Sequence, residues 1–191
     1  MSAPSELLNY INGQWKRSSA ADSMPVHNPA SNAVIATVAL SPAAEVDEAV
    51  RLAQAAFPGW RSTPVVERVQ PLFRLKMLLE ENLDAIARII TEECGKTYAE
   101  SVGEMRRGIE NVETACGMPV LIQGYNNEDI ASGIDEHMFR QPLGVVAAIT
   151  PFNFPGMIPF WFLPYAVATG NCFILKPSEK VPMTGRKIFE L

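Results

Sequence analysis

The sequence has 191 residues, of which 48% are hydrophobic and 19% charged, and its formal net charge is −5. This composition is typical of a folded globular protein, because disordered chains contain fewer apolar residues and more charge. The acidic balance and the absence of a basic stripe argue against nucleic-acid binding. The most apolar stretch, residues 154–169, is interrupted by prolines and a glycine and is too short to cross a bilayer comfortably.

Three cysteines, Cys94, Cys116 and Cys172, lie far apart in the sequence, without a CxxC motif or a Cys/His cluster. This spacing predicts neither a zinc site nor a disulfide framework. The N-terminal residues lack the basic and apolar regions of a secretory signal and the arginine-rich pattern of a mitochondrial presequence. We therefore expect a reducing, cytoplasmic setting, with no membrane and no metal.

The first 40 residues predict short strands. Residues 7–11 and 14–16 flank Asn12-Gly13, a pair typical of a two-residue type I′ hairpin turn, because both turn positions need positive φ. Residues 26–29 are predicted to be extended. Residues 33–40 form a second β-rich segment.

Helices are predicted next. Ser41-Pro42 is expected to start the first, with Ser41 as N-cap, and Pro58-Gly59 is expected to end it. Thr63-Pro64 starts another helical pattern that Gly95 closes, and whether Asn82 splits this pattern into two helices is left open. One more helix is predicted over residues 98–115.

The character of the chain changes over residues 120–141, which are polar and contain a Ser132-Gly133 turn between two extended pieces. We interpret this segment as an excursion from the main domain, in the form of a β-hairpin.

The C-terminal third predicts a strand–helix–strand unit. Residues 144–149 form a continuous apolar run that suits a strand covered on both faces, and residues 172–176 form a second strand. Residues 157–169 fill the helix between them, and Gly170-Asn171 supplies its stop. Parallel strands joined in this way define an α/β fold, in which ligands bind beyond the carboxyl ends of the strands.

Three segments carry a resemblance to a known family: ITPFNFP at 149–155, ILKPSE at 174–179 and RRGIENVETACGMP at 106–119. With them the chain resembles the N-terminal portion of the aldehyde dehydrogenase superfamily, in particular its acylating methylmalonate-semialdehyde (malonate-semialdehyde) branch. The resemblance implies an incomplete Rossmann-like NAD-binding domain over 1–123 and 142–191. It also implies an oligomerisation hairpin over 124–141, and a catalytic domain outside this chain.

Asn153 follows the first strand of the unit and is held between Pro151 and Pro155. From the residues alone, a turn or a cap of the following helix is the better interpretation. The resemblance implies instead that its side-chain amide stabilises the oxyanion formed when a thiol adds to an aldehyde.

A second cluster, Lys176, Ser178 and Glu179, follows the second strand. Taken alone, Lys176 and Glu179 form a solvated pair of little consequence. The resemblance implies that the cluster binds the adenosine ribose of the cofactor, and a carboxylate there favours NAD over NADP because it repels a 2′-phosphate. The resemblance also implies cofactor contacts for the segment between the strand and Asn153, namely Ile149, Thr150, Pro151 and Phe152. No GxGxxG motif occurs in the sequence.

Arg107 lies beside Arg106 in a helical run, where an exposed basic face is the simplest interpretation. The resemblance suggests that Arg107 binds the carboxylate of a semialdehyde acid, which a guanidinium can do with two hydrogen bonds. Phe152 and Phe162 are candidates for the apolar lining of an aldehyde tunnel, although aromatic residues in such a helix are more often part of the core.

The chemistry requires a thiolate nucleophile, and none of the three cysteines lies in the family's Gly-Gln context. We expect all three to be structural and the 191-residue chain alone to be inactive. The resemblance implies that the longer enzyme oxidises methylmalonate or malonate semialdehyde with NAD, transfers the acyl group to coenzyme A and assembles as a homo-oligomer. Two alternatives remain: a non-acylating aldehyde dehydrogenase of the succinate-semialdehyde type, and a non-catalytic fragment that acts by association or nucleotide binding.

Overall fold

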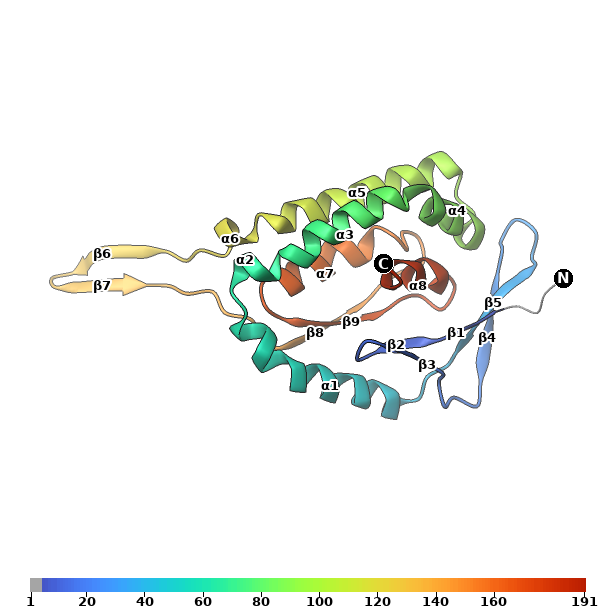
Figure 1. Cartoon of the computed structure of the whole chain (residues 1–191), viewed down its shortest axis with the longest axis horizontal. Coiled ribbons are helices and arrows are strands. Elements are labelled where there is room, and N and C mark those ends of the chain that lie inside the picture. The colour runs from blue at the N-terminus through green and yellow to red at the C-terminus, as the bar shows by residue number, and fades with distance from the viewer. Residues whose placement is uncertain (1–4) are drawn as a thin grey trace.

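The computed structural model describes residues 5–191. Two parallel strands, β8 (Val145–Ile149) and β9 (Cys172–Lys176), run through the middle of the molecule (Figure 1). Helix α1 (Ala43–Ser62) packs on one face of this pair and helix α7 (Ile158–Ala168) on the other. The chain therefore has the predicted α/β architecture.

The strand–helix–strand unit forms as predicted, with β8 and β9 paired in parallel from Val145–Cys172 to Ile149–Lys176. The expectation that the first strand is covered on both faces is only partly met. Ala148 is buried, but Val145 is half-buried and Ile149 is 82% exposed. Val145 borders an open hollow of about 480 Å³ between β8 and α1, and Val146 borders another of about 340 Å³ between β8 and α7.

The C-terminal end of α7 is fixed by several polar contacts. The buried Arg68 guanidinium donates to the Ala168 carbonyl at 3.0 Å, where the negative end of the helix dipole favours a cation. The Asn171 carboxamide oxygen accepts from the backbone N–H groups of Leu143 and Gly144 at 2.7 and 3.0 Å. The predicted stop after α7 is therefore confirmed. No helix among residues 5–191 combines the length and the apolar character needed to cross a membrane.

Helix α1 differs from its predicted bounds at both ends. Its N-cap is Pro42 rather than Ser41, and it continues through Pro58-Gly59 to Ser62. The predicted end was wrong because a tertiary contact stabilises the last turn: the Trp60 indole N–H donates to the Val167 carbonyl of α7 at 3.1 Å.

Five helices between α1 and the hairpin build the layer that covers α7 (Figure 1). Asn82 separates α3 from α4, which settles the question that the sequence left open, and Gly95 ends α4 in the left-handed conformation, as predicted. A capping box between Thr97 and Glu100 begins α5. The bounds are α2 (Val65–Arg68), α3 (Gln70–Glu81), α4 (Leu83–Cys94), α5 (Tyr98–Cys116) and α6 (Met118–Leu121).

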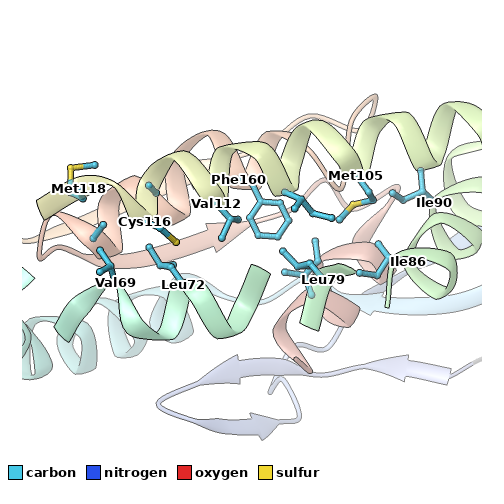
Figure 2. Packing of buried hydrophobic residues seen from close by; sticks show 14 residues of the cluster. Val69, Leu72, Leu79, Ile86, Ile90, Met105, Val112, Cys116, Met118 and Phe160 are labelled. Atoms are coloured by element: carbon cyan, nitrogen blue, oxygen red, sulfur yellow. The ribbon is translucent and has the colours of Figure 1, made fainter. Parts of the chain in front are cut away.

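The main hydrophobic core lies between these helices and α7 (Figure 2). Phe160 of α7 is fully buried at its centre, against α5 at Gly108, where an added β-carbon would come within 2.9 Å of the Phe160 ring. The segment of α3 and α4, with the N-cap of α3, supplies Val69, Leu72, Leu79, Ile86 and Ile90, and α5 supplies Met105, Ile109, Val112, Ala115 and Cys116.

The N-terminal strands form two small sheets. The predicted type I′ hairpin is confirmed, with φ of 52° at Asn12 and 75° at Gly13. Its first strand is shorter than predicted, because Leu7 belongs to β1, which pairs in parallel with β5. The strands are β1 (Ser5–Leu7), β2 (Asn9–Ile11), β3 (Gln14–Lys16), β4 (Ser23–His27) and β5 (Val34–Ala39), and the larger sheet has the order β1-β5-β4.

The predicted excursion is an antiparallel hairpin of β6 (Asn126–Ala131) and β7 (Ile134–His137), which projects away from the rest of the molecule (Figure 1). All of its residues are exposed. The chain ends with α8 (Pro182–Phe189), which packs against α4.

Candidate functional site

The two loops expected to carry the site leave β8 and β9 at the same edge of the sheet. The backbone N–H of Thr150 donates to the Lys176 carbonyl at 3.1 Å, so the two loops begin next to one another. Thr150 is buried, whereas Ile149 and Phe152 are 82% and 52% exposed. Pro151 is also exposed, so this edge presents apolar surface beside charged groups.

Asn153 lies in the first loop with its side chain exposed. The interpretation that it caps the following helix is wrong, because the backbone N–H groups of Gly156 and Met157, just before α7, are bound by Glu104 of α5 at 2.7 and 3.1 Å. Its role as an oxyanion donor stays a prediction. The exposed position leaves the carboxamide accessible to a small molecule.

Glu104 and Lys96 are residues that the sequence analysis missed. Glu104 is 3% exposed and forms a salt bridge with Lys96, whose ammonium lies 3.8 Å from the centre of the Phe154 ring. A signal for Glu104 was present, because it falls on the buried stripe of α5 between Ser101 and Gly108, and a buried carboxylate needs partners. Nothing in the sequence identified those partners.

The second loop carries the predicted ribose cluster. The Lys176 ammonium pairs with Glu179 at 2.9 Å, and both side chains are largely exposed. The hydrogen bond from Lys176 lowers the pKa of Glu179, so this carboxyl is ionised at neutral pH. Ser178 is buried, and its hydroxyl accepts from the Lys180 backbone N–H at 3.3 Å. Of the three side chains, Lys176 and Glu179 therefore face solvent and are available to a ligand.

Arg107 is exposed on α5, close to the point where this helix passes Gly156 and Met157. Its neighbour Arg106 forms a salt bridge with Glu80 of α3. Within residues 5–191, Arg107 forms no salt bridge, so its guanidinium is available to an external carboxylate.

The three cysteines have the environment expected of structural residues. Burial raises the pKa of the thiols of Cys94, Cys116 and Cys172, which disfavours the thiolate form. The part of the chain that the structure describes contains no cluster of acidic, histidine and cysteine side chains suited to a metal ion. Phe162 is 48% exposed on α7, so it is not a core residue in this structure.

The parallel strand–helix–strand unit, with polar residues beyond the carboxyl ends of its strands, defines an α/β protein of the class that binds ligands at those ends. The aldehyde dehydrogenase family model matches residues 15–191, and the chain belongs to that family.

Several relatives have names that state a substrate, which the family description does not. Malonate-semialdehyde dehydrogenase 2 of Geobacillus kaustophilus is 50% identical over 185 residues, which is 97% of this chain and 38% of the relative. A solved structure from Sinorhizobium meliloti, assigned as a methylmalonate-semialdehyde dehydrogenase and complexed with NAD, superposes with a TM-score of 0.95 at 38% identity. The superposition covers 100% of the present chain and 39% of the Sinorhizobium meliloti chain.

A methylmalonate-semialdehyde dehydrogenase from Oceanimonas doudoroffii is 45% identical, with a TM-score of 0.92 over 96% of this chain and 38% of its own. The chain thus spans about two fifths of the length of the relatives it matches.

Proposed function

We propose that this chain is part of an enzyme that oxidises malonate or methylmalonate semialdehyde with NAD and transfers the acyl group to coenzyme A. The observation that carries the proposal is the meeting of two loops at one sheet edge. One loop presents Asn153, and the other presents Lys176 and Glu179. The names of the relatives, malonate- and methylmalonate-semialdehyde dehydrogenases, support this substrate class.

The residues of the second loop fit an adenosine ribose. The Glu179 carboxylate accepts hydrogen bonds from ribose hydroxyls and the Lys176 ammonium donates to them, at the place where parallel sheets bind nucleotides. Ile149, Thr150, Pro151 and Phe152 supply the wall of the cofactor cleft, and Ser178 holds the turn between Lys176 and Glu179. When bound, NAD supplies the acceptor for the hydride of the aldehyde.

In the first loop, the Asn153 amide N–H donates to the oxyanion that forms when a thiol adds to the aldehyde carbon. Arg107 binds the carboxylate at the other end of the substrate with charge-assisted hydrogen bonds. The raised pKa values of Cys94, Cys116 and Cys172 support a nucleophile outside these 191 residues. We assign oligomer formation to the exposed β6–β7 hairpin and place the enzyme in the cytoplasm, which its free cysteines support.

The test uses the protein encoded by the complete reading frame that contains these residues. NADH formation from malonate semialdehyde is measured with and without coenzyme A, and the product is identified by mass spectrometry. We expect an acyl-coenzyme A product and a rate that depends on coenzyme A. A free carboxylic acid formed at the same rate without coenzyme A would indicate the non-acylating class. NAD binding without oxidation of any aldehyde would contradict both the acylating and the non-acylating dehydrogenase function.

A further inference from the structure

The loop that carries Asn153, residues 152–157, is held by one segment of the helical layer. Three residues of that segment contact it: the Cys94 thiol donates to the Phe152 carbonyl at 3.5 Å, the Lys96 ammonium lies on the Phe154 ring, and Glu104 binds the end of the loop. We call Cys94, Lys96 and Glu104 the loop clamp. Phe152 and Phe154, on either side of Asn153, are thus both contacted by it.

Glu104 is the centre of the clamp. Its Oε1 accepts from the N–H groups of Gly156 and Met157, and its other carboxylate oxygen pairs with Lys96. The Glu104 side chain is 1% exposed and that of Lys96 is 18% exposed. Removing either partner of this pair would leave an uncompensated buried charge, so we expect the loss of either one to disturb the loop that Glu104 holds.

The loop also lies as close to the helices as its backbone allows. A β-carbon on Gly156 would come within 2.9 Å of the Ile90 side chain and 3.3 Å of Glu104 Oε1. The loop end therefore rests directly on α4 and α5. The exposed Asn153 lies in a loop that is contacted at the Phe152 carbonyl, the Phe154 ring and the Gly156 N–H.

From this geometry we propose that the Lys96–Glu104 pair is the positioning device of the oxyanion loop, which holds Asn153 ready for the substrate. The inference rests on the proposed function, because Asn153 must be the oxyanion donor for its position to affect the rate. An electrostatic donor is effective only if its place is set before the reaction begins. A displacement of about 1 Å costs on the order of 100-fold in rate.

The test combines Glu104→Gln with Asn153→Ala in the complete enzyme. Glu104→Gln keeps an acceptor for the loop N–H groups but removes the charge that pairs with Lys96. We expect kcat to fall about 10- to 100-fold while the Kd for NAD stays unchanged. In an enzyme that already carries Asn153→Ala, Glu104→Gln should lower kcat little further, since Glu104 acts on the reaction through Asn153. Glu113→Gln, an exposed position on the same helix, is the matched control.

A second measurement does not depend on activity. Hydrogen exchange at the Gly156 and Met157 amides should accelerate in Glu104→Gln and in Lys96→Met, but not in Glu113→Gln. Unchanged exchange, or losses in kcat that add fully in the double variant, would overturn the positioning role. If Asn153→Ala alone retained full kcat, the oxyanion role in the proposed function would fail, and faster exchange would show that the clamp still orders the loop.

Discussion

Glu93 of α4 caps the N-terminus of α8 through Thr184. One carboxylate oxygen of Glu93 accepts from the Thr184 backbone N–H at 2.8 Å and from the Thr184 hydroxyl, and the other accepts from the Met183 N–H at 2.7 Å. Glu93 is 3% exposed. The first-turn N–H groups of a helix have no partner within the helix, so this carboxylate satisfies groups that burial would otherwise leave unpaired.

The first prediction follows from the protonation of Glu93. Burial raises its pKa to about 7, against the opposing effect of the three hydrogen bonds. Because the folded state binds this proton more tightly than the unfolded state, the stabilisation is complete below the ordinary pKa of 4.5 and is lost as the pH rises through 7. The loss amounts to about 3 kcal/mol of the free energy of unfolding.

The measurement is urea unfolding of the wild-type protein and Glu93→Gln between pH 4.5 and 8. Glutamine keeps the shape and does not titrate, so the difference in free energy of unfolding between the two proteins isolates Glu93. We expect the advantage of the wild type to shrink over this range. An advantage that grows with pH would mean that the hydrogen bonds outweigh burial and that Glu93 is ionised.

Glu93 and Glu104 show what the sequence could not reveal. Each is a buried carboxylate that binds backbone N–H groups at the start of a helix, with a sequence separation of 91 residues in one case and 52 in the other. Periodicity places both residues on helices, but it carries no information about which distant helix end needs a cap. Such partners follow only from the tertiary arrangement of α4, α5, α7 and α8.

The second prediction concerns two glycines on α5. Gly108→Ala should lower the free energy of unfolding by about 1–3 kcal/mol, because the new methyl group would lie 2.9 Å from the buried Phe160 ring. Gly103→Ala is the matched control on the same helix: nothing lies within 4 Å of its added β-carbon, and alanine favours the helix by about 0.5–1 kcal/mol. Thermal unfolding of both variants checks this. Equal effects would contradict the close packing of α5 on α7.

The sequence predicted turns and helix ends correctly where the backbone conformation of the residues themselves determines them. Asn12-Gly13 formed its hairpin turn and Gly95 ended its helix, because both depend on positive φ at those residues. Pro58-Gly59 failed as a stop because the contact of Trp60 with α7 outweighs the local preference. Turn chemistry was thus predictable, whereas helix ends that depend on distant contacts were not.

The third prediction separates Arg107 from Arg106 in the complete enzyme. Arg107→Leu should raise the KM for malonate semialdehyde about 10- to 100-fold, the cost of losing charge-assisted hydrogen bonds to a carboxylate. The KM for propanal, which has no carboxylate, should change little. Arg106→Leu removes the same charge but breaks only the salt bridge with Glu80, so both KM values should stay near those of the wild type. An equal effect of the two variants would exclude a specific role for Arg107.

The fourth prediction tests the choice of cofactor at Glu179. Its lowered pKa keeps this carboxylate charged, and its partner Lys176 is held by the salt bridge. Glu179→Gln removes the repulsion of a 2′-phosphate and frees the Lys176 ammonium to bind it. The affinity for NADP relative to NAD should therefore rise about five- to tenfold.

Calorimetric titration of both cofactors into the complete enzyme measures the effect of Glu179→Gln. Glu113→Gln, at an exposed position of α5, makes the same change in net charge and serves as the control. A preference for NAD that survives in Glu179→Gln, or one that shifts equally in both variants, would place the discrimination elsewhere. The exposed Lys176–Glu179 pair would then be a surface salt bridge with little effect on binding.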